Sequence, residues 1–569
     1  MTTLPILLAL AAAATAPALA ASPEGVPDVI YYNGRIATLD PARPDASAVA
    51  VKDGRFEAVG GSADMLALVG SGTRAIDLEG RRVVPGLIDA HTHPMETLMM
   101  KEGWVDARFP QTPSVRQALA NIAEWVRRTP KGNWIFVACV SASENKFAEK
   151  RLPTKAELDA VAPDNPLVLA NGTHMAVANA MALRMLGVTR GAFALKGGGR
   201  ALAGPDGEPN GTLTDAMGAA PTTPSGDDLK RYYATGIPAL WNANGFTSVL
   251  AITPAQALPA LGAAARMGGP TIRYTISVWT APDAEGMPET LGAFAMPEGV
   301  DPAYFRVAAI KTWADGENDG RTGLMYEPYE GHFDTDPPGG RGSLVTSAPA
   351  MRRFVEIADR NGVAAMIHCS GDKATDLCLD AYEHEAAAGS GHAIMRIEHF
   401  GMFQLAPHQL ERAAALKKRG LFVSIQPTWL LDLARADVEN MGEERARTGF
   451  RFRALIDAGL EPAAGTDVTG IYLANVDPFL GIYAAVTRDS DMGPFEPDQA
   501  VTVSEALKMW TIWAARAIGE DAVKGSIEPG KYADMTVLSD DIFAMPKERL
   551  KEVRAVETIV GGRVVYEAK

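Results

Sequence analysis

An apolar run that ends in two histidines constrains this chain more than any other feature of its sequence. Residues 83–90, Val-Val-Pro-Gly-Leu-Ile-Asp-Ala, have the length of a strand and lead directly into His91-Thr92-His93. Side chains alternate faces along a strand, so His91 and His93 point the same way. Two imidazoles on one face at the end of a buried strand can bind one metal ion together. The alternative is two chance histidines, and it predicts no further ligands downstream.

Size and composition limit the class of protein and of partner. The chain has 569 residues, 47% of them hydrophobic and 22% charged, which is typical of a soluble globular protein larger than one ordinary domain. The net charge of −15 argues against a nucleic-acid partner, because phosphate binding needs a basic face. Three cysteines without a CxxC spacing provide neither a zinc knuckle nor a disulfide framework. We expect a small-molecule substrate and no nucleic acid, and the sequence leaves a homodimer open.

The N-terminal segment is typical of a secretory signal peptide. Residues 4–10 are apolar, an alanine-rich run follows, and Ala-Leu-Ala at 18–20 provides a small-residue cleavage site. We expect residues 1–21 to be removed and the mature protein to be exported, periplasmic or secreted. No Lys or Arg precedes the apolar run, so a membrane anchor is the alternative. No later stretch is long and apolar enough to span a bilayer, which predicts no stable membrane insertion after cleavage.

Both ends of the mature chain are rich in strand signals. Residues 22–82 include Asp53-Gly54, a hairpin turn signal between two apolar runs. Residues 525–569 have the same character, with a second hairpin over 556–566. Two β-rich ends around a long middle predict one small β-sandwich domain that is built from both termini.

The middle of the chain, residues 83–524, alternates apolar strand-like runs with helical segments, as a parallel α/β architecture does. Helices are expected at Ala348–Arg360, Pro407–Arg419 and Glu444–Ala458. Eight strand candidates predict a (β/α)8 barrel. The strand candidates are Val83–Ala90, Phe246–Ile252, Thr271–Trp279, Phe305–Trp313, Val363–His368, Ala393–His399, Leu421–Gln426 and Glu461–Asp467.

One span does not fit the barrel repeat. Residues from about 101 to 225 separate the first strand candidate from the second, which is far longer than one helix. We expect an inserted subdomain there, with a helix over Ser114–Arg128. Insertions after a barrel strand lie on the catalytic face, so this one is placed to cover the site as a lid.

The later strand candidates carry further potential ligands at their C-terminal ends. The fourth contains Lys311, and the fifth ends at His368. The sixth ends at Glu398-His399 and the eighth at Asp467. The C-terminal ends of barrel strands form the catalytic face, so these side chains are expected to meet the two histidines of the first strand.

These motifs together resemble the metal-dependent amidohydrolase superfamily, and within it the YtcJ-like branch that includes N-substituted formamide deformylases. The resemblance covers nearly the whole mature chain, and the ordered set of motifs is far more specific than the histidine pair alone. The motifs are PGLIDAHTH at 85–93, KTWADG at 311–316, IH at 367–368, RIEH at 396–399, GTD at 465–467 and GSIEPGKYAD at 525–534.

The resemblance implies a centre of one or two divalent metal ions, with zinc as the default for imidazole-rich ligation and manganese, iron or nickel as alternatives. Its histidine ligands would be His91 and His93 for the more buried metal, and His368 and His399 for the more exposed one. Lys311 would bridge the two metals as a carbamate, because carbon dioxide on the amine makes an anion with two oxygens. The alternative is an unmodified Lys311 that pairs with Asp315 beside a single metal.

Asp467 resembles the last-strand aspartate of the superfamily, which is both a metal ligand and the general base. A carboxylate that touches metal-activated water can take its proton and later pass it to the leaving nitrogen. The alternative is a helix N-cap after the strand. Glu398 is expected to orient a neighbouring group rather than to bind metal.

Three further residues are candidates for substrate binding. His174 matches a Gly-x-His pattern associated with this branch and would reach the substrate from the insert, although a structural histidine explains it equally well. Trp313 ends the fourth strand candidate and Trp429 follows the seventh, so the two would form an aromatic wall, although aromatic residues are more often core.

The function implied is hydrolysis of a C–N bond in an amide, N-formyl or N-acyl compound. The same metals would also suit an esterase, a lactonase or another hydrolase, because the pocket rather than the metal selects the substrate. A non-catalytic protein that keeps the fold is a further alternative.

Overall fold

The structure is a computed structural model of residues 1–569. It describes 26–140, 143–172, 175–195, 199–214, 220–222, 224–267, 269–280, 294–296, 298–331, 339–388, 394–468 and 476–569. The predicted signal peptide at 1–21 and the candidate His174 lie outside the described residues. No helix among the described residues is long and apolar enough to cross a membrane.

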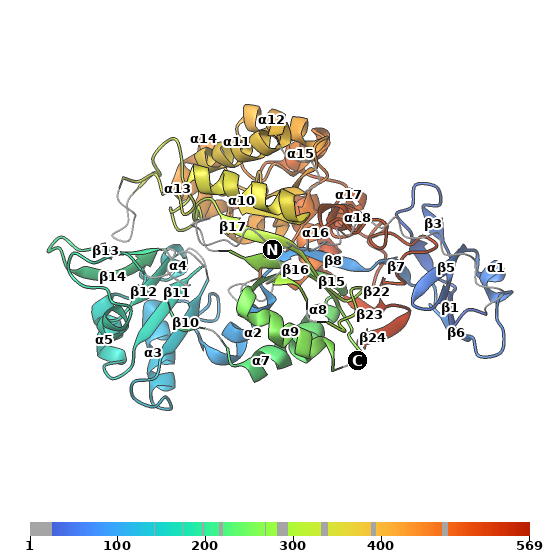
Figure 1. The fold of residues 1–569 in the computed structure, drawn as a ribbon, viewed down its shortest axis with the longest axis horizontal. Coiled ribbons are helices and arrows are strands. Elements are labelled where there is room, and N and C mark those ends of the chain that lie inside the picture. Colours follow the sequence, from blue (N-terminus) through green and yellow to red (C-terminus); the bar gives the residue numbers. More distant parts are fainter. Residues whose placement is uncertain are drawn as a thin grey trace, which may run out of the picture.

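An eight-stranded parallel sheet forms the centre of the molecule (Figure 1). Its order, β21-β20-β19-β18-β17-β16-β15-β8, follows the chain strand by strand and makes a nearly closed (β/α)8 barrel, as the sequence predicts. The strands are β8 (Leu87–Thr92), β15 (Phe246–Pro254), β16 (Arg273–Trp279), β17 (Phe305–Trp313), β18 (Ala364–His368), β19 (Met395–Glu398), β20 (Leu421–Ile425) and β21 (Ala463–Ala464).

The first strand candidate, Val83–Ala90, is divided between two sheets. Its first half is β7 (Arg82–Pro85), which belongs to a β-domain outside the barrel, and its second half begins β8. The break is at Gly86, whose N–H donates to the carbonyl oxygen of Asp534. A Cβ on Gly86 would lie 2.3 Å from Thr247 Oγ1, so the crossing between sheets needs glycine here.

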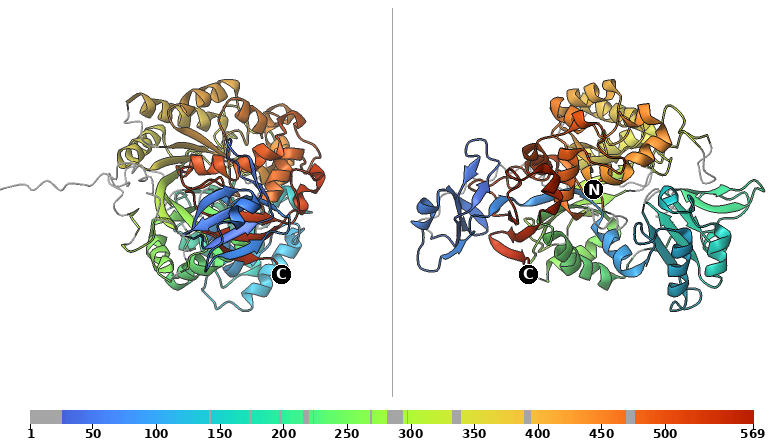
Figure 2. Two further views of the ribbon diagram at one scale, coloured as in Figure 1. Left: turned by 90° about the vertical axis from the view of Figure 1, so that its right-hand side faces the viewer. Right: turned by 180° about the vertical axis from the view of Figure 1, so that it is seen from behind.

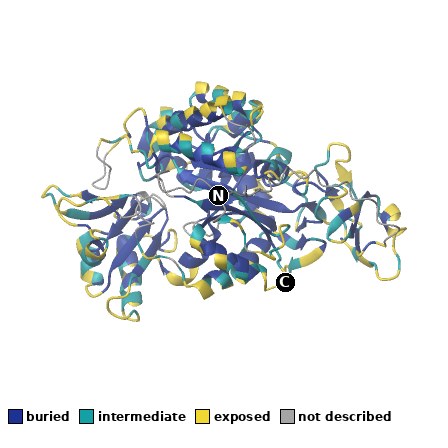
Figure 3. Cartoon of the chain, in the orientation of Figure 1, coloured by how far each residue is buried: buried dark blue, intermediate teal, exposed yellow. Residues whose placement is uncertain are grey.

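Helices surround the barrel, and their exposed residues lie on the faces that point away from it (Figure 3). The helices between and after the barrel strands are α7 (Gly226–Arg231), the π-helix η2 (Tyr232–Gly236), α8 (Ile237–Asn242), α9 (Leu258–Ala265), α10 (Ala348–Asn361), α11 (Asp372–Ala388), α12 (Pro407–Lys417), α13 (Leu430–Met441), α16 (Pro478–Thr487), α17 (Val503–Met509) and α18 (Ile512–Ala517). The two expected helices that begin at Ala348 and Pro407 are thus present.

The helix expected at Glu444–Ala458 is wrong as one element. The structure has α14 (Glu443–Ala446) and α15 (Phe452–Asp457) instead. Between them the N–H groups of Phe450 and Arg451 donate to carbonyl oxygens of the loop after β19, and Phe450 has a positive φ of 49°. These tertiary hydrogen bonds replace the helical ones, because each backbone N–H group can donate its single hydrogen to only one of them.

Strands from both ends of the chain form the β-domain, which lies at one end of the long axis (Figure 2). One sheet has the order β5-β4-β1-β6. The other, β24-β23-β22-β7-β2-β3, joins three C-terminal strands to three N-terminal strands through the pairing of β22 with β7. The strands are β1 (Val29–Tyr32), β2 (Arg35–Ala37), β3 (Asp45–Ala46), β4 (Ala48–Lys52), β5 (Arg55–Gly60), β6 (Arg74–Asp77), β22 (Met535–Leu538), β23 (Ala555–Val560) and β24 (Arg563–Glu567). Short helix α1 (Ser62–Leu66) covers the first sheet.

A separate subdomain lies between β8 and β15, at the opposite end of the long axis from the β-domain (Figures 1 and 2). Its sheet has the order β13-β14-β12-β11-β10-β9. The strands are β9 (Val105–Asp106), β10 (Ile135–Cys139), β11 (Leu167–Asn171), β12 (Met175–Ala178), β13 (Arg200–Ala203) and β14 (Pro209–Thr214). The helices of this segment are α2 (Pro94–Gly103), α3 (Val115–Val126), α4 (Ser143–Lys146), α5 (Lys155–Val161) and α6 (Ala180–Met185).

Candidate metal centre

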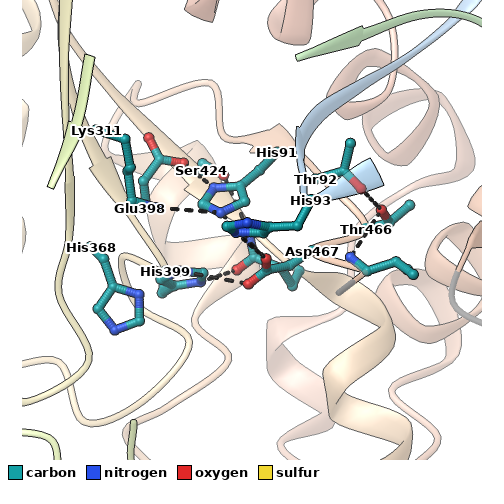
Figure 4. Close-up of polar contacts among 12 residues, drawn as sticks. His91, Thr92, His93, Lys311, His368, Glu398, His399, Ser424, Thr466 and Asp467 are labelled. Carbon is teal, nitrogen blue, oxygen red and sulfur yellow. Dashed lines mark hydrogen bonds and ion pairs between the residues drawn. The ribbon is translucent and has the colours of Figure 1, made fainter. Parts of the chain in front are cut away.

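The C-terminal ends of the barrel strands bring most of the predicted site residues together (Figure 4). His91 on β8, His399 after β19 and Asp467 after β21 each offer one ligand atom, and these atoms lie within 4.8 Å of one another. The Asp467 carboxylate also lies 3.4 Å from Nε2 of His91, 3.4 Å from Nε2 of His93 and 3.8 Å from Nε2 of His399. One carboxylate therefore faces three imidazoles.

An irregularity in β8 places His91 in this cluster. Asp89 pairs with Val249 of β15, but Thr92 pairs with Ala251, so β8 advances three residues where β15 advances two. An extra residue of this kind shifts the alternation of side chains and is common beside active sites. It allows Ala90 to pack in the barrel core while His91, the next residue, faces the candidate ligands.

A buried carboxylate fixes the orientation of His91. Glu398 Oε2 lies 2.5 Å from Nδ1 of His91, which leaves Nε2 directed toward Asp467. Arg396 donates to both oxygens of Glu398 and to the carbonyl oxygen of Ala90. All three side chains are fully buried. In metal-binding histidines, the ring nitrogen that does not bind the metal commonly donates to a carboxylate, which sets the tautomer of the histidine. This arrangement agrees with the expectation that Glu398 orients a neighbouring group.

His399 is held in the same way by an amide. Its Nδ1 lies 2.7 Å from Oε1 of Gln426, whose Nε2 donates to Ser424 Oγ. His399 and Asp467 both have a positive φ, 66° and 46° respectively. Residues other than glycine rarely adopt a positive φ. Such backbone conformations are concentrated at functional sites, where the surrounding structure enforces them.

The loop that carries Asp467 is locked against β8. The Asp467 N–H donates to the carbonyl oxygen of His91, and Asp89 accepts hydrogen bonds from the N–H and Oγ1 of Thr466. Gly465 allows this approach, since a Cβ on it would lie 2.5 Å from Cβ of His91. Burial raises the pKa of Asp89 to about 6.

Lys311 lies in the cluster without the predicted alternative partner. Its Nζ is 3.4 Å from Nε2 of His91, and the residue is only 1% exposed. Asp315 instead accepts from the N–H groups of Leu324, Ser370 and Gly371. Burial lowers the pKa of Lys311 to about 8, although the nearby carboxylates of Glu398 and Asp467 oppose the shift.

His368 lies beside the cluster rather than inside it. Its ring centroid is 4.5 Å from that of His399, but its Nε2 faces the carbonyl oxygen of Gly316 at 3.0 Å and Ser370 Oγ at 3.1 Å.

Burial and neighbouring cations lower the pKa of both His91 and His399 well below their ordinary values, so these rings are neutral and able to bind metal.

The tryptophans predicted to contact substrate lie at the rim of the cluster. Trp429 stacks on His399 with ring centroids 5.1 Å apart and an interplanar angle of 8°. Trp313 ends β17, pairs with His368, and meets the ring of Trp279 edge-on at 5.2 Å.

Sequence reasoning missed three residues of this region. Arg396 carried a signal, because it lies two residues before Glu398 on the same strand and so shares its face. Trp279 ends β16 and its ring centroid lies 6.0 Å from that of His93, but it looked like an ordinary strand residue. Glu96, in the first turn of α2, had no signal at all.

Glu96 is a buried carboxyl in an apolar setting. The residue is 8% exposed, and neither oxygen has a hydrogen-bond partner in another described residue. Burial raises its pKa to about 8, and only its own backbone N–H opposes the shift. At neutral pH most of the population therefore keeps its proton.

The chain matches a family and curated relatives along almost all of its length. The model described as "Amidohydrolase family" matches residues 74–566. Protein LONG AFTER FAR-RED 3 of Arabidopsis thaliana is 30% identical, over 95% of this chain and 92% of its own. N-substituted formamide deformylase of Arthrobacter pascens is 28% identical, over 95% of this chain and 98% of its own. Putative amidohydrolase YtcJ of Bacillus subtilis (strain 168) is 28% identical, over 95% and 99%.

Solved structures show the same architecture. An uncharacterized metal-dependent hydrolase from Pyrococcus horikoshii OT3 is 25% identical, with a TM-score of 0.68 over 91% of this chain and 99% of its own. A zinc-bound adenosine deaminase from Xanthomonas campestris is 14% identical, with a TM-score of 0.51 over 95% of this chain and 93% of its own, and it shares the fold. These matches confirm the resemblance and the fold class predicted from the motifs.

Proposed function

Because the chain belongs to the amidohydrolase family, whose members include metal-dependent hydrolases of non-peptide C–N bonds, we propose that its substrate is an N-formyl or N-acyl amine. The observation that carries this proposal is the Asp467 carboxylate facing three imidazoles at the catalytic end of the barrel. The relative named N-substituted formamide deformylase supports an N-formyl substrate in particular.

The donor set fits a divalent metal ion. Neutral imidazoles and a carboxylate are the ligands that zinc and similar ions prefer, and His91 and His399 are oriented by second contacts on their far nitrogens. His91, His93, His399 and Asp467 would hold the ion, with His368 at the edge for a second one. When bound, such an ion polarises the substrate carbonyl and lowers the pKa of its water.

Asp467 is placed to move the proton. The Asp467 side chain is 9% exposed, and its carboxylate faces the histidines. A water held between the carboxylate and the imidazoles is therefore within reach of the carboxylate. A general base in this position takes the proton of the attacking water and delivers it to the leaving nitrogen. The amine then departs with a full set of protons, and the acyl group leaves as the carboxylic acid.

We further propose that Lys311 carries a carbamate, as the resemblance implies. The side chain is buried and its Nζ lies beside His91 rather than beside Asp315. An ammonium at this position would repel a dication, whereas a carbamate supplies two anionic oxygens. Trp313, Trp429 and His174 are proposed to contact the substrate, as the sequence predicts.

A substrate panel tests the function directly. Purified protein is assayed on N-formyl amines, N-acetyl amines, esters and lactones of matched size, with and without a chelator. We expect hydrolysis of the formyl or acetyl amines, its loss on chelation and its return on adding metal. Turnover of esters or lactones alone would move the protein to the alternative class, and no turnover with full metal content would favour a non-catalytic protein.

The number of metal ions per chain tests whether a carbamate on Lys311 bridges two metals. Elemental analysis of wild type and Lys311→Ala is expected to give about two metals per chain falling toward one, and a ¹³C-bicarbonate NMR signal for the carbamate only in wild type. One metal in both proteins, without the signal, would leave a mononuclear site beside an unmodified lysine.

A further inference from the structure

Trp279 faces the candidate metal centre, yet the proposed chemistry gives it no role. It is the last residue of β16 and pairs directly with Lys311 of β17. Directly paired residues of neighbouring parallel strands project from the same face of the sheet. Because Lys311 reaches His91 on that face, the indole points into the mouth of the barrel. There it packs on inner core residues that include Ile252 and Ala309.

Two rings hold the indole in place. It meets His93 with ring centroids 6.0 Å apart and an interplanar angle of 70°, and Trp313 at 5.2 Å and 88°. Edge-to-face contacts of this kind fix the plane of an aromatic ring and hence the direction of its N–H. The donor is therefore preorganised beside a candidate metal ligand.

The indole N–H is buried and has no acceptor among the described residues. Nε1 of Trp279 has essentially no exposed surface and no hydrogen-bond partner in the described part of the chain. Buried donors in native proteins nearly always have a partner, since leaving one unmet costs free energy. In an active site a donor of this kind commonly finds its acceptor in the substrate.

We propose that the Trp279 Nε1–H group donates a hydrogen bond to the acyl oxygen of the bound substrate. The bond strengthens as negative charge develops on that oxygen during attack by water, so Trp279 lowers the barrier as well as positioning the carbonyl. This inference rests on the proposed function, and it requires a substrate with an oxygen acceptor on the carbon that is attacked.

Trp279→Phe removes the N–H and keeps an aromatic ring. We expect kcat on the best formyl or acetyl amine to fall roughly 10-fold to 100-fold with metal content unchanged, somewhat less than is typical for the loss of an oxyanion donor, because a metal shares the charge. The matching thioacyl substrate separates electrostatics from packing, since sulfur is a poor acceptor. The loss should shrink on the thioacyl compound, and an equal loss on both substrates would overturn the proposal.

Trp510→Phe is the matched control. Trp510 is fully buried, and its Nε1 also lacks a partner among the described residues. Its ring centroid lies 5.8 Å from that of Phe246, which begins β15 at the end of the strand opposite the candidate ligands. We expect kcat to be unchanged in this variant, and a loss as large as that of Trp279→Phe would refute the assignment.

If Trp279→Phe does not fold, 3-benzothienylalanine at position 279 replaces the N–H by sulfur in a ring of the same size, with the same expected loss. A wild type that hydrolyses no formyl or acyl amine overturns both this inference and the proposed function. An active wild type with an equally active variant overturns the inference alone.

Discussion

Glu96→Gln should change how the stability of the protein depends on pH. The folded protein keeps the Glu96 proton up to a pKa of about 8, whereas an unfolded chain releases it near the ordinary value of 4.5. Between these values the folded state binds more protons, so the free energy of unfolding of wild type falls as pH rises. The glutamine variant cannot ionise and lacks this loss.

The size of the effect follows from the two pKa values. Each unit of difference corresponds to about 1.4 kcal/mol, so the burial of this carboxyl costs at most about 5 kcal/mol above pH 8. Between pH 5 and pH 7 alone, wild type should lose about 2–3 kcal/mol relative to the variant. No discount for solvent screening applies, because Glu96 is only 8% exposed.

Urea denaturation at pH 5, 6, 7 and 8, followed by tryptophan fluorescence, measures the difference in free energy of unfolding at each pH. The glutamine amide adds a constant offset, so only the slope of the difference against pH matters. Glu124→Gln, on the exposed face of α3, is the control and should give a flat difference. A flat difference for Glu96→Gln as well would show that Glu96 titrates alike in both states and would refute the reasoning.

Three further experiments test other parts of the structure. Asp467→Asn should lower kcat about 10²-fold to 10⁴-fold if the carboxylate moves the proton, and a loss under 10-fold at equal metal content would exclude that role. Gly465→Ala places a Cβ 2.5 Å from that of His91, so elemental analysis should find less bound metal than in wild type; full occupancy would contradict the packing argument. Arg273→Met breaks a two-bond contact with Asp534, both side chains being 4% exposed, and should cost about 3–5 kcal/mol in urea unfolding. The double variant with Asp534→Leu should recover most of that loss, and no recovery would mean that the pair is not the cause.

The elements that the sequence predicts well are those whose signal is local. Phe305–Trp313 matches β17 at both ends, and the Asp53-Gly54 turn joins β4 to β5, with both turn residues at positive φ. Apolar runs flanked by turn residues carry their own boundaries. The meeting of His91, His399 and Asp467 was predictable for a different reason, because the strand ends of a barrel converge on one face whatever the details of packing.

The features that the sequence does not reveal depend on contacts distant along the chain. Gly86 divides one apolar run between two sheets, and no property of the run itself marks the division. The turn of His368 Nε2 toward Gly316 depends on a loop, and the burial of Glu96 depends on packing around α2. Trp279 reads as an ordinary strand residue until its neighbours are known.

The position of β7 makes the strand that carries His91 dependent on a segment more than 400 residues further along the chain. β7 is hydrogen-bonded on one side to β2 and on the other to β22, near the C-terminus, and it continues through Gly86 into β8. Pairings of such long sequence separation form late, since the loop between them must close first. Synthesis must therefore proceed at least through Leu538 before β7, which leads into the strand of His91, gains its second partner strand. A chain truncated before β22 should therefore hold the strand of His91 less firmly than the full chain does.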